Sequence, residues 1–319
     1  MYSLLGLRNM LVLTLLICFN VGAVWSGSSL NFVAIGDWGV PLAAQESMYF
    51  GYIAEKLESQ FTLALGDNFY DKGVSSTSDP QWQATYEDVY TARSLQSRWY
   101  VVAGNHDHYG DVEAEVEYTK QSSRWYMPNL YYDEVMQLPG GSGSVHFIFT
   151  DSYSLVGDGN QLPDRTQLQW IESALSNSTS QWKLVIGHYP ILSVGEHGTN
   201  KFLDDYLRPL LEKYGVAAYI SGHDHGQQHL MENSVHYLVF GNGAKSEAQD
   251  HHAVDSGVLQ WRWPASDSDQ DMCQRMTNKE CYGFGFISMT PQALTASYYS
   301  LNVGNVNYRV TIPLPSAPF

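Results

Sequence analysis

The sequence predicts an α/β layered fold, in which buried β-strands alternate with amphipathic helices. Two observations support this prediction. Short apolar runs rich in Val, Ile, Leu and Phe recur along the 319-residue chain and stop at or near a glycine, which is typical of buried strands. The longer segments between these runs carry apolar residues at helical spacing, which is typical of helices with one buried face.

Five of the apolar runs are followed at once by a residue type that can bind a metal. These runs are 32–35 before Asp37, 61–65 before Asp67, 100–103 before Asn105, 184–186 before His188 and 216–220 before His223. In open α/β sheets, ligands lie outside the carboxyl ends of the strands. We therefore expect the five polar residues to converge on one site.

The remaining elements complete the alternation. Helices are predicted at 45–58, 81–93, 165–175 and 200–214, and further strands at 145–150, 235–240, 284–289, 295–299 and 308–312. Asp79 and Pro80 supply a capping carboxylate and a first-turn proline for the second helix. No linker, low-complexity tract or tandem repeat interrupts residues 28–319, which we expect to form a single domain.

The N-terminus has the features of a signal peptide. One charge, Arg8, precedes an apolar run from Met10 to Phe19, and small residues follow up to Gly27. The alternative is a transmembrane anchor, but the apolar run is short for one and no second span of membrane length follows. We therefore predict removal of residues 1–27 and delivery to the extracellular fluid or to a lysosome-like compartment, without a membrane anchor.

The cysteines and one tripeptide are compatible with secretion. Cleavage removes Cys18 and leaves Cys273 and Cys281, which can pair in an oxidising compartment or remain as two free thiols. The bridge would close a short loop, so that its entropic effect should be modest. The tripeptide at 177–179 makes Asn177 a glycosylation acceptor if the chain is secreted.

The charge balance excludes some partners. The formal net charge is −16, from 17 Lys+Arg against 33 Asp+Glu. An acidic chain repels nucleic acid and anionic membranes, so neither is an expected partner. A site for a phosphate anion would have to create its own positive charge, and bound metal ions could supply it.

Five short motifs carry the metal-binding residue types. They are GDWG at 36–39, GDNFY at 66–70, GNHDH at 104–108, GHYP at 187–190 and GHDH at 222–225. Their donors are carboxylate, imidazole, amide oxygen and phenol, which suit zinc, iron or manganese rather than a cysteine-based structural zinc site. Each motif alone is compatible with an ordinary turn, but five turns would not each place a ligand type after a strand and a glycine.

The order of these motifs resembles the metallophosphoesterase superfamily, over Asn31 to about Phe240. Tyr70, at the end of the second motif, is similar to the tyrosine of the purple acid phosphatases, whose colour comes from a phenolate bound to ferric iron. The length, the GHYP motif and the EHG motif at 196–198 resemble the small animal-type, tartrate-resistant enzymes. The resemblance implies a four-layer α/β/β/α sandwich, with two mixed β-sheets packed face to face and helices outside.

The resemblance also implies a dinuclear centre that contains Fe(III) and a divalent ion, which is Fe(II), Zn or Mn. The implied ligands are Asp37, Tyr70 and His225 for the ferric ion, Asn105, His188 and His223 for the divalent ion, and Asp67 as the bridge between them. Three negative ligands against five positive charges leave an excess that suits a phosphate anion, even after a bridging hydroxide is counted. Two divalent ions would leave the same site neutral.

The activity that the resemblance implies is that of an acid phosphatase. Hydroxide held by the metals would attack phosphate monoesters, either small molecules or phosphoproteins. His106 and His197 are the candidates for assisting the leaving group, although His197 alone could also be an ordinary surface histidine. Asp107 and His108 are candidates for orienting the metal ligands. The enzyme is expected to be a monomer.

Two alternatives remain open. The chain could be a divalent-metal phosphodiesterase or nucleotidase of the same superfamily, which Tyr70 argues against. It could also be a secreted, non-catalytic binding protein on this scaffold, with 9 Trp and 22 Tyr as contact surface. A scaffold that has lost its activity usually loses ligands, and no ligand position is missing here.

Overall fold

The computed structural model describes residues 28–40, 44–159, 161–269, 271, 281–301 and 306–315. The predicted signal peptide, residues 1–27, lies outside the described residues. So does Cys273, the predicted partner of Cys281. Cys281 itself is buried and disulfide-bonded, but its pairing with Cys273 stays a prediction.

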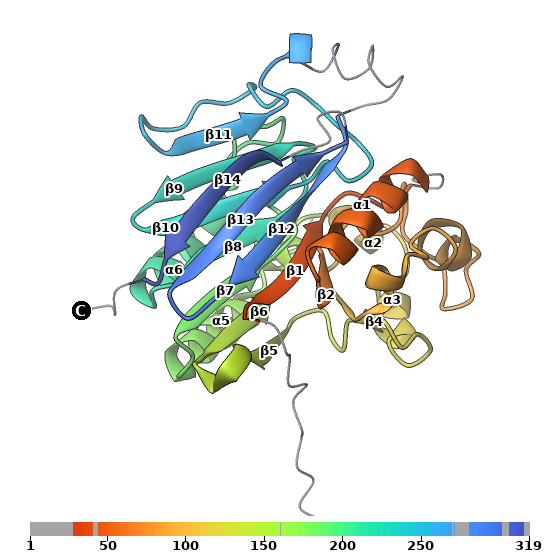
Figure 1. Cartoon of the computed structure of the whole chain (residues 1–319), viewed down its shortest axis with the longest axis horizontal. Coiled ribbons are helices and arrows are strands. Elements are labelled where there is room, and N and C mark those ends of the chain that lie inside the picture. The colour runs from red at the N-terminus through yellow and green to blue at the C-terminus, as the bar shows by residue number, and fades with distance from the viewer. Residues whose placement is uncertain are drawn as a thin grey trace, which may run out of the picture.

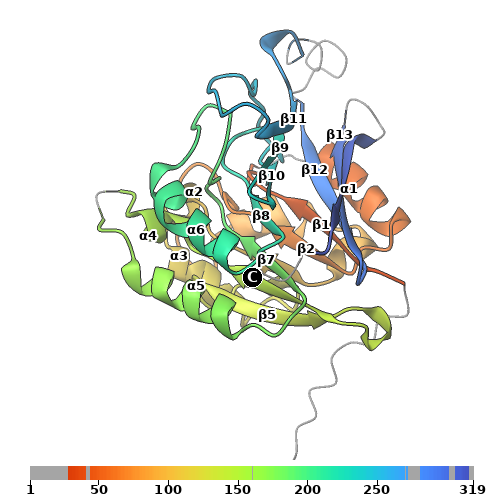
Figure 2. The same cartoon turned by 90° about the vertical axis from the view of Figure 1, so that its left-hand side faces the viewer.

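The chain forms two sheets that lie against each other, with helices on their outer faces (Figure 1). Seen along the edge, α1 lies on one side of the pair, and α4, α5 and α6 lie on the other (Figure 2). This arrangement confirms the predicted four-layer α/β/β/α sandwich. Within the described residues, no helix has an apolar stretch long enough to cross a bilayer.

The first sheet is mixed and has the strand order β14-β13-β12-β1-β2-β3-β4. β1, β2, β3 and β4 run parallel to one another, whereas β12 is antiparallel to β1, and β13 and β14 continue the antiparallel part. The strands are β1 (Leu30–Ile35), β2 (Phe61–Ala64), β3 (Trp99–Val101), β4 (Trp125–Tyr126), β12 (Gly283–Met289), β13 (Ala293–Ser300) and β14 (Val306–Pro313).

The second sheet is also mixed, with the order β11-β9-β10-β8-β7-β6-β5. Its centre is parallel, from β6 through β7 and β8 to β10, and antiparallel strands flank it. The strands are β5 (Tyr132–Gln137), β6 (Ser144–Phe149), β7 (Trp182–Ile186), β8 (Ala218–Ser221), β9 (Gln227–Glu232), β10 (Val235–Phe240) and β11 (Leu259–Trp263).

The helices are short apart from two. The α-helices are α1 (Ala44–Lys56), α2 (Asn105–His108), α3 (Val112–Tyr118), α4 (Ser152–Val156), α5 (Arg165–Asn177) and α6 (Arg208–Lys213). Short 3₁₀ segments occur at Arg93–Gln96 and Pro139–Gly141, and π-helical turns at Trp82–Glu87 and Leu203–Leu207.

Two predicted helices differ from those observed. The helix predicted at 200–214 is observed over residues 201–213, but it contains a π-helical turn before α6, because Pro209 cannot donate a backbone hydrogen bond and its ring crowds the preceding turn. The helix predicted at 81–93 is reduced to the turn Trp82–Glu87. Trp82, Tyr86 and Tyr90 bury their rings in an aromatic cluster under α1, and this tertiary packing overrides the helical preference.

The central strands are apolar along their whole length because both of their faces are buried. In β1, Phe32 and Ala34 belong to the core between the sheets, whereas Val33 and Ile35 belong to the core under α1. A third apolar core lies under α5 and α6. Strands buried on both sides read as continuous apolar runs rather than alternating ones, which is why the sequence revealed them.

Two buried histidines connect β9 to β10. His229 Nε2 lies 2.9 Å from His236 Nδ1, and His229 Nδ1 lies 2.9 Å from the hydroxyl of Tyr308 on β14. Burial lowers the pKa of His229 to about 3, with a further contribution from His236, and lowers the pKa of His236 to about 4. Both imidazoles are therefore neutral in the folded protein, even in mildly acidic solution.

This pair should make stability depend on pH. Below their ordinary pKa of about 6.5 both histidines take up protons in the unfolded chain but not in the folded one, so stability is lost as the pH falls from about 6.5 towards 4. The contribution is at most about 1.4 kcal/mol per pH unit for each histidine. The free energy of unfolding, measured by chemical denaturation at several pH values, should fall less steeply with falling pH in His236→Leu than in the wild type. Equal slopes would contradict this account.

Candidate metal centre

The five strands that end in a motif bring their carboxyl ends to one edge of the sandwich. β1, β2 and β3 are parallel neighbours in the first sheet, and β7 and β8 are parallel neighbours in the second. The amide of Gly36, after β1, donates to the carbonyl of Phe240, at the end of β10, at 2.8 Å. This bond joins the two sheets where the motif residues emerge.

Three of the motif residues have backbone angles in the left-handed region. The φ angles are 58° at Asp37, 52° at Asp67 and 72° at His223. Residues other than glycine rarely adopt this region, and such strain is concentrated at functional sites where neighbouring contacts hold it. Here the amide of Asp37 donates to the Gly66 carbonyl at 3.0 Å, and the amide of His223 donates to Asp37 Oδ2 at 2.8 Å.

A first group of donors lies around the Tyr70 hydroxyl. This oxygen is 3.2 Å from Asp37 Oδ1 and 3.4 Å from His225 Nε2, and the two latter atoms are 3.6 Å apart. Donors bound to one ion at about 2.1 Å in tetrahedral geometry stand about 3.4 Å from each other. The three atoms therefore have the spacing that a single metal ion requires.

A second group lies around His188. Its Nε2 atom is 3.2 Å from Asn105 Oδ1 and 3.3 Å from Asp67 Oδ1. The His223 ring lies beside the His188 ring, with centroids 5.0 Å apart. Ligand atoms of Asp37, Asp67 and His188 all lie within 4.8 Å of one another, so Asp67 is close to both groups. The structure thus brings all seven residues of the predicted ligand set to one edge.

The acidic members of this cluster are buried next to each other. Asp37, Asp67 and Tyr70 are 0%, 1% and 6% exposed. Burial, and then the charge of Asp67, raise the pKa of Asp37 well above its usual range, while burial and then Asp37 raise the pKa of Tyr70. Among the described residues, the cationic partners of the two carboxylates are histidines only. A bound cation would supply the missing positive charge, so these residues fit a metal centre.

The histidines of the cluster are held in the form that binds metals. His188 Nδ1 donates to the Leu65 carbonyl at 2.8 Å, which leaves the Nε2 lone pair directed at Asn105 and Asp67. Burial lowers the pKa of His188, and burial together with His188 lowers that of His223 well below its usual value. Neutral imidazoles are the form that a metal ion requires.

His225 is oriented by a residue that the sequence did not reveal. Its Nδ1 atom lies 2.7 Å from Glu247 Oε1. Glu247 belongs to residues 243–247, which follow β10 and which we call the rim loop. The rim loop is attached to two motifs, because the amide of Ala244 donates to the Asp37 carbonyl at 2.9 Å and that of Glu247 donates to the His225 carbonyl at 2.8 Å. Only Gly241, just before the rim loop, and Gly243, its first residue, mark this loop in the sequence.

The two candidate proton donors lie on different sides of the cluster. His106 Nδ1 is 2.6 Å from the carbonyl of Asp71, and its Nε2 atom lies 3.9 Å from Asp67 Oδ2. His197 Nδ1 is 3.0 Å from Asp224 Oδ1, and its ring centroid lies 3.9 Å from that of His223. Since a carbonyl or an ionised carboxylate accepts the Nδ1 proton, each ring has its other nitrogen available.

Asp224 is a second residue that the sequence did not reveal as functional. It is fully buried and also accepts from the backbone amide of His197 at 2.8 Å and from the Ser193 hydroxyl. The hydrogen bond from His197 is the largest cause that raises the pKa of this histidine. Asp224 therefore fixes both the orientation of His197 and its preference for the protonated form.

Asp107 binds backbone amides around the site, whereas His108 binds a carboxylate side chain. Asp107 accepts from the amides of Gly104 at 2.7 Å and Asn68 at 2.9 Å, which ties the second and third motifs together. Burial, and then the charge of Asp67, raise its pKa to about 7. His108 Nε2 lies 2.9 Å from Asp151 Oδ1 at the start of α4.

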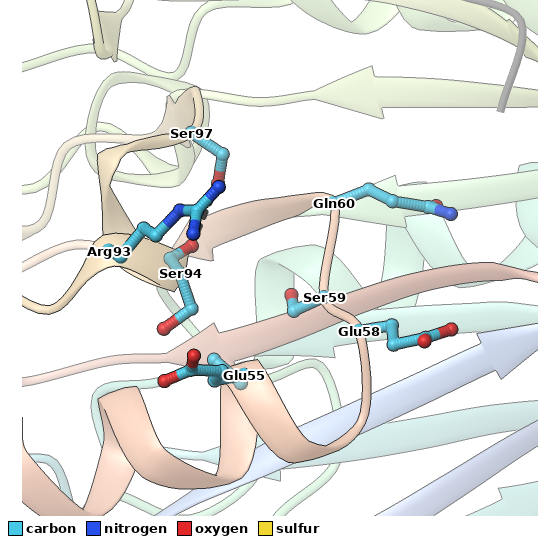
Figure 3. Close-up of a pocket in the computed structure, with 8 residues that line it drawn as sticks. Glu55, Glu58, Ser59, Gln60, Arg93, Ser94 and Ser97 are labelled. Carbon is cyan, nitrogen blue, oxygen red and sulfur yellow. Dashed lines mark hydrogen bonds between the residues drawn. The ribbon is translucent and has the colours of Figure 1, made fainter.

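Two of the hollows formed by the described residues are relevant to substrate binding. One, of about 530 Å³, adjoins the cluster and is lined in part by His197, His223, Tyr189 and Phe202. The other, of about 590 Å³, lies between the end of α1 and the segment 93–97, with Glu55 and Glu58 on one side and Arg93 on the other (Figure 3). Its lining contains none of the predicted site residues, so we assign the substrate of this centre to the first hollow.

The fold and this donor set define a metal-dependent phosphoesterase. Residues 30–227 match the calcineurin-like phosphoesterase family. Tartrate-resistant acid phosphatase type 5 of Oryctolagus cuniculus is 38% identical over 309 residues, which cover 89% of this chain and 91% of that protein. The human protein of the same name is 36% identical, with 91% and 93% coverage. Purple acid phosphatase 17 of Arabidopsis thaliana is 34% identical, with 72% of each chain covered.

The chain therefore belongs to the calcineurin-like phosphoesterases and, within them, to the purple acid phosphatases. As a member of this family it hydrolyses phosphate esters at a metal centre. Solved structures agree in fold. A Plasmodium structure entitled "GAP50 the anchor in the inner membrane complex of Plasmodium" has a TM-score of 0.79 at 24% identity, covering 91% of this chain and 90% of its own. Yellow lupin purple acid phosphatase PPD1 has a TM-score of 0.63 at 15% identity, covering 90% of this chain and 54% of its own.

Replacing Glu247 should weaken metal binding. In Glu247→Gln the side chain keeps its size but loses the charge that orients His225 and raises its basicity, so metal affinity should fall about 10- to 100-fold. Competition with a chelator, followed by metal analysis, measures the change. Glu117→Gln, at an exposed position of α3, is the matched control. Equal metal retention in the two variants would contradict the assigned role of Glu247.

Proposed function

We propose that this protein is an acid phosphatase that hydrolyses phosphate monoesters at a dinuclear centre of Fe(III) and a divalent ion, which is Fe(II), Zn or Mn. One observation carries the proposal. The hydroxyl of Tyr70 lies 3.2 Å from Asp37 Oδ1 and 3.4 Å from His225 Nε2. A buried phenol in such a triangle becomes an anionic ligand only next to a strong Lewis acid, and ferric iron is the ion that suits it.

The charges of the ligands support unequal metal ions. Asp37, Asp67 and ionised Tyr70 contribute three negative charges, so a trivalent and a divalent ion leave a positive excess that binds phosphate. When bound, the two ions would supply this charge and would lower the pKa of water so that a nucleophile is available below neutral pH. The divalent-metal phosphodiesterase is the less favoured candidate, because it gives the buried phenol no role.

The protein's own groups would position the ester and provide a proton. His197 adjoins the hollow beside the cluster and is held by Asp224, so its Nε2–H can donate to the leaving oxygen. His106 occupies the corresponding place beside Asp67 and Tyr70, with ring centroids of Tyr70 and His106 4.4 Å apart. Both histidines can also attract the phosphate anion when they are protonated.

We also propose that the enzyme acts outside the cytosol, as a monomer. Disulfide-bonded Cys281 supports the location outside the cytosol, since disulfides are typical of oxidising compartments. Asn177 is exposed at the end of α5 and is accessible for glycosylation. Recovery of the native protein from the cytosol, with residues 1–27 retained, would contradict the proposal.

Loss of His197 should slow the chemistry without releasing the metals. We expect kcat of His197→Ala to fall about 10²-fold, because a positioned acid typically contributes about 10²- to 10⁴-fold. The metal content should stay that of the wild type, since His197 is not a predicted ligand. Exposed His251→Ala is the control. Unchanged kcat in His197→Ala would remove this residue from the mechanism.

The proposed centre is tested by colour and metal content together. The purified protein should absorb visible light, contain iron, and hydrolyse p-nitrophenyl phosphate at mildly acidic pH. His188→Ala should abolish turnover and lower the metal content, and Tyr70→Phe should lose the visible absorption.

A colourless protein with stoichiometric zinc and a preference for diesters would favour the divalent-metal alternative. A protein without metal or turnover would favour the non-catalytic binding protein.

A further inference from the structure

We propose that Lys245 is a positioning residue of the metal centre, which holds a fixed positive charge against the ring of Tyr70 and stabilises it as an anion. The inference deepens the proposed function and rests on it. Lys245 lies in the rim loop, outside every motif that the sequence analysis identified.

The contact between the two side chains is close. Lys245 Nζ lies 3.8 Å from the centroid of the Tyr70 ring. A cation within about 6 Å of a ring centroid is attracted to the ring face, and the attraction strengthens where water is excluded. Lys245 is half-buried, and the Tyr70 ring is almost completely buried.

The backbone on both sides of Lys245 is fixed to the metal motifs. The preceding residue, Ala244, donates its amide to the carbonyl of Asp37 at 2.9 Å. Two residues later, Glu247 binds His225 through both its amide and its carboxylate. The hydrogen bonds to Asp37 and His225 therefore fix the backbone of Lys245, and with it the position of its side chain over the Tyr70 ring.

Among the residues that the structure describes, no carboxylate neutralises the charge of Lys245. Within the described parts of the chain, its ammonium group has no Asp or Glu within ion-pair distance, whereas Lys120, Lys201 and Lys213 each have one. This is notable in a chain with 33 acidic and 17 basic residues. The positive charge therefore acts mainly on the Tyr70 ring.

Such a charge acts more strongly on the ionised than on the neutral tyrosine. Ionisation spreads negative charge from the oxygen into the ring, so a cation over the ring face stabilises the phenolate and lowers the energy of its donor electrons. If Tyr70 binds ferric iron, the visible band comes from transfer of these electrons to the metal. Removing the charge should therefore move the band to longer wavelength.

The test is the visible spectrum of the metal-loaded protein. Lys245→Met keeps the aliphatic stem but removes the charge, Lys245→Arg keeps the charge, and Lys56→Met removes a lysine 5.7 Å from the exposed Tyr52 ring. We expect the band of Lys245→Met to lie at longer wavelength, and those of Lys245→Arg and Lys56→Met to lie close to the wild type. Band position does not depend on how much iron is bound, so partial metal loss does not obscure the result.

The outcomes separate the two proposals. A coloured wild type whose band coincides with that of Lys245→Met overturns the role of Lys245 and leaves the proposed function in place. A shift of equal size in Lys56→Met would also overturn it, because the effect would then be unspecific. A colourless wild type overturns the proposed function and, with it, this inference.

Discussion

Burial of three acidic side chains at one point is the constraint on which the architecture depends. Asp37, Asp67 and Tyr70 are withdrawn from water where the two sheets meet, and burial, followed by their mutual repulsion, raises the pKa values of Asp37 and Tyr70. Such a cluster is unfavourable unless cations offset it. The neutral imidazoles of His188 and His223 do not provide that charge. The fold therefore contains a buried acidic site whose negative charge is compensated only when metal ions are bound.

The sandwich explains how residues so far apart in sequence reach this place. Parallel strands in each sheet end at the same edge, and the bond from Gly36 to Phe240 holds the two edges together. The left-handed turns at Asp37, Asp67 and His223 then direct the side chains inward. Hydrogen bonds to the strained residues, rather than favourable intrinsic geometry, maintain these turns. The same bonds limit the freedom of the ligands before any metal arrives.

A second layer of contacts determines how the ligands behave. Leu65 and Glu247 select the nitrogen that His188 and His225 present, while Asp224 orients His197. The rim loop adds the charge of Lys245 to this layer. The predicted metal ligands therefore come from the ends of strands, whereas the residues that orient them come mostly from other loops. The residues that would bind the metal ions are thus distinct from those that orient the ligands.

The sequence predicted the fold class and the convergence of the donors because both depend on local signals. The central strands are apolar runs because both of their faces are buried, and the runs that lead into the site are followed by a glycine and a residue type that can bind a metal. Strand β9 was missed because Gln227, Gln228 and His229 are polar yet buried. Gln227 donates to the carbonyl of Tyr299, 72 positions away, and no local pattern reveals such a partner.

The residues that orient the site side chains were also missed, because no local pattern reveals their partners. Glu247, Asp224 and Lys245 acquire their roles only through contacts with residues distant in sequence. The helix predicted at 81–93 was wrong in extent because aromatic packing decided the backbone there. Local preference therefore predicted the elements that carry the ligands, whereas tertiary contacts decided what surrounds them.

The central claim is that Asp67 stands between two cations of unequal charge, one of which contacts Tyr70. The most direct measurement is a crystal structure of the metal-loaded protein with anomalous diffraction collected at the iron absorption edge. The account predicts two metal peaks that share Asp67, with an iron signal at the one bound by the Tyr70 oxygen. A single peak, or a Tyr70 oxygen outside bonding distance of either ion, would contradict it.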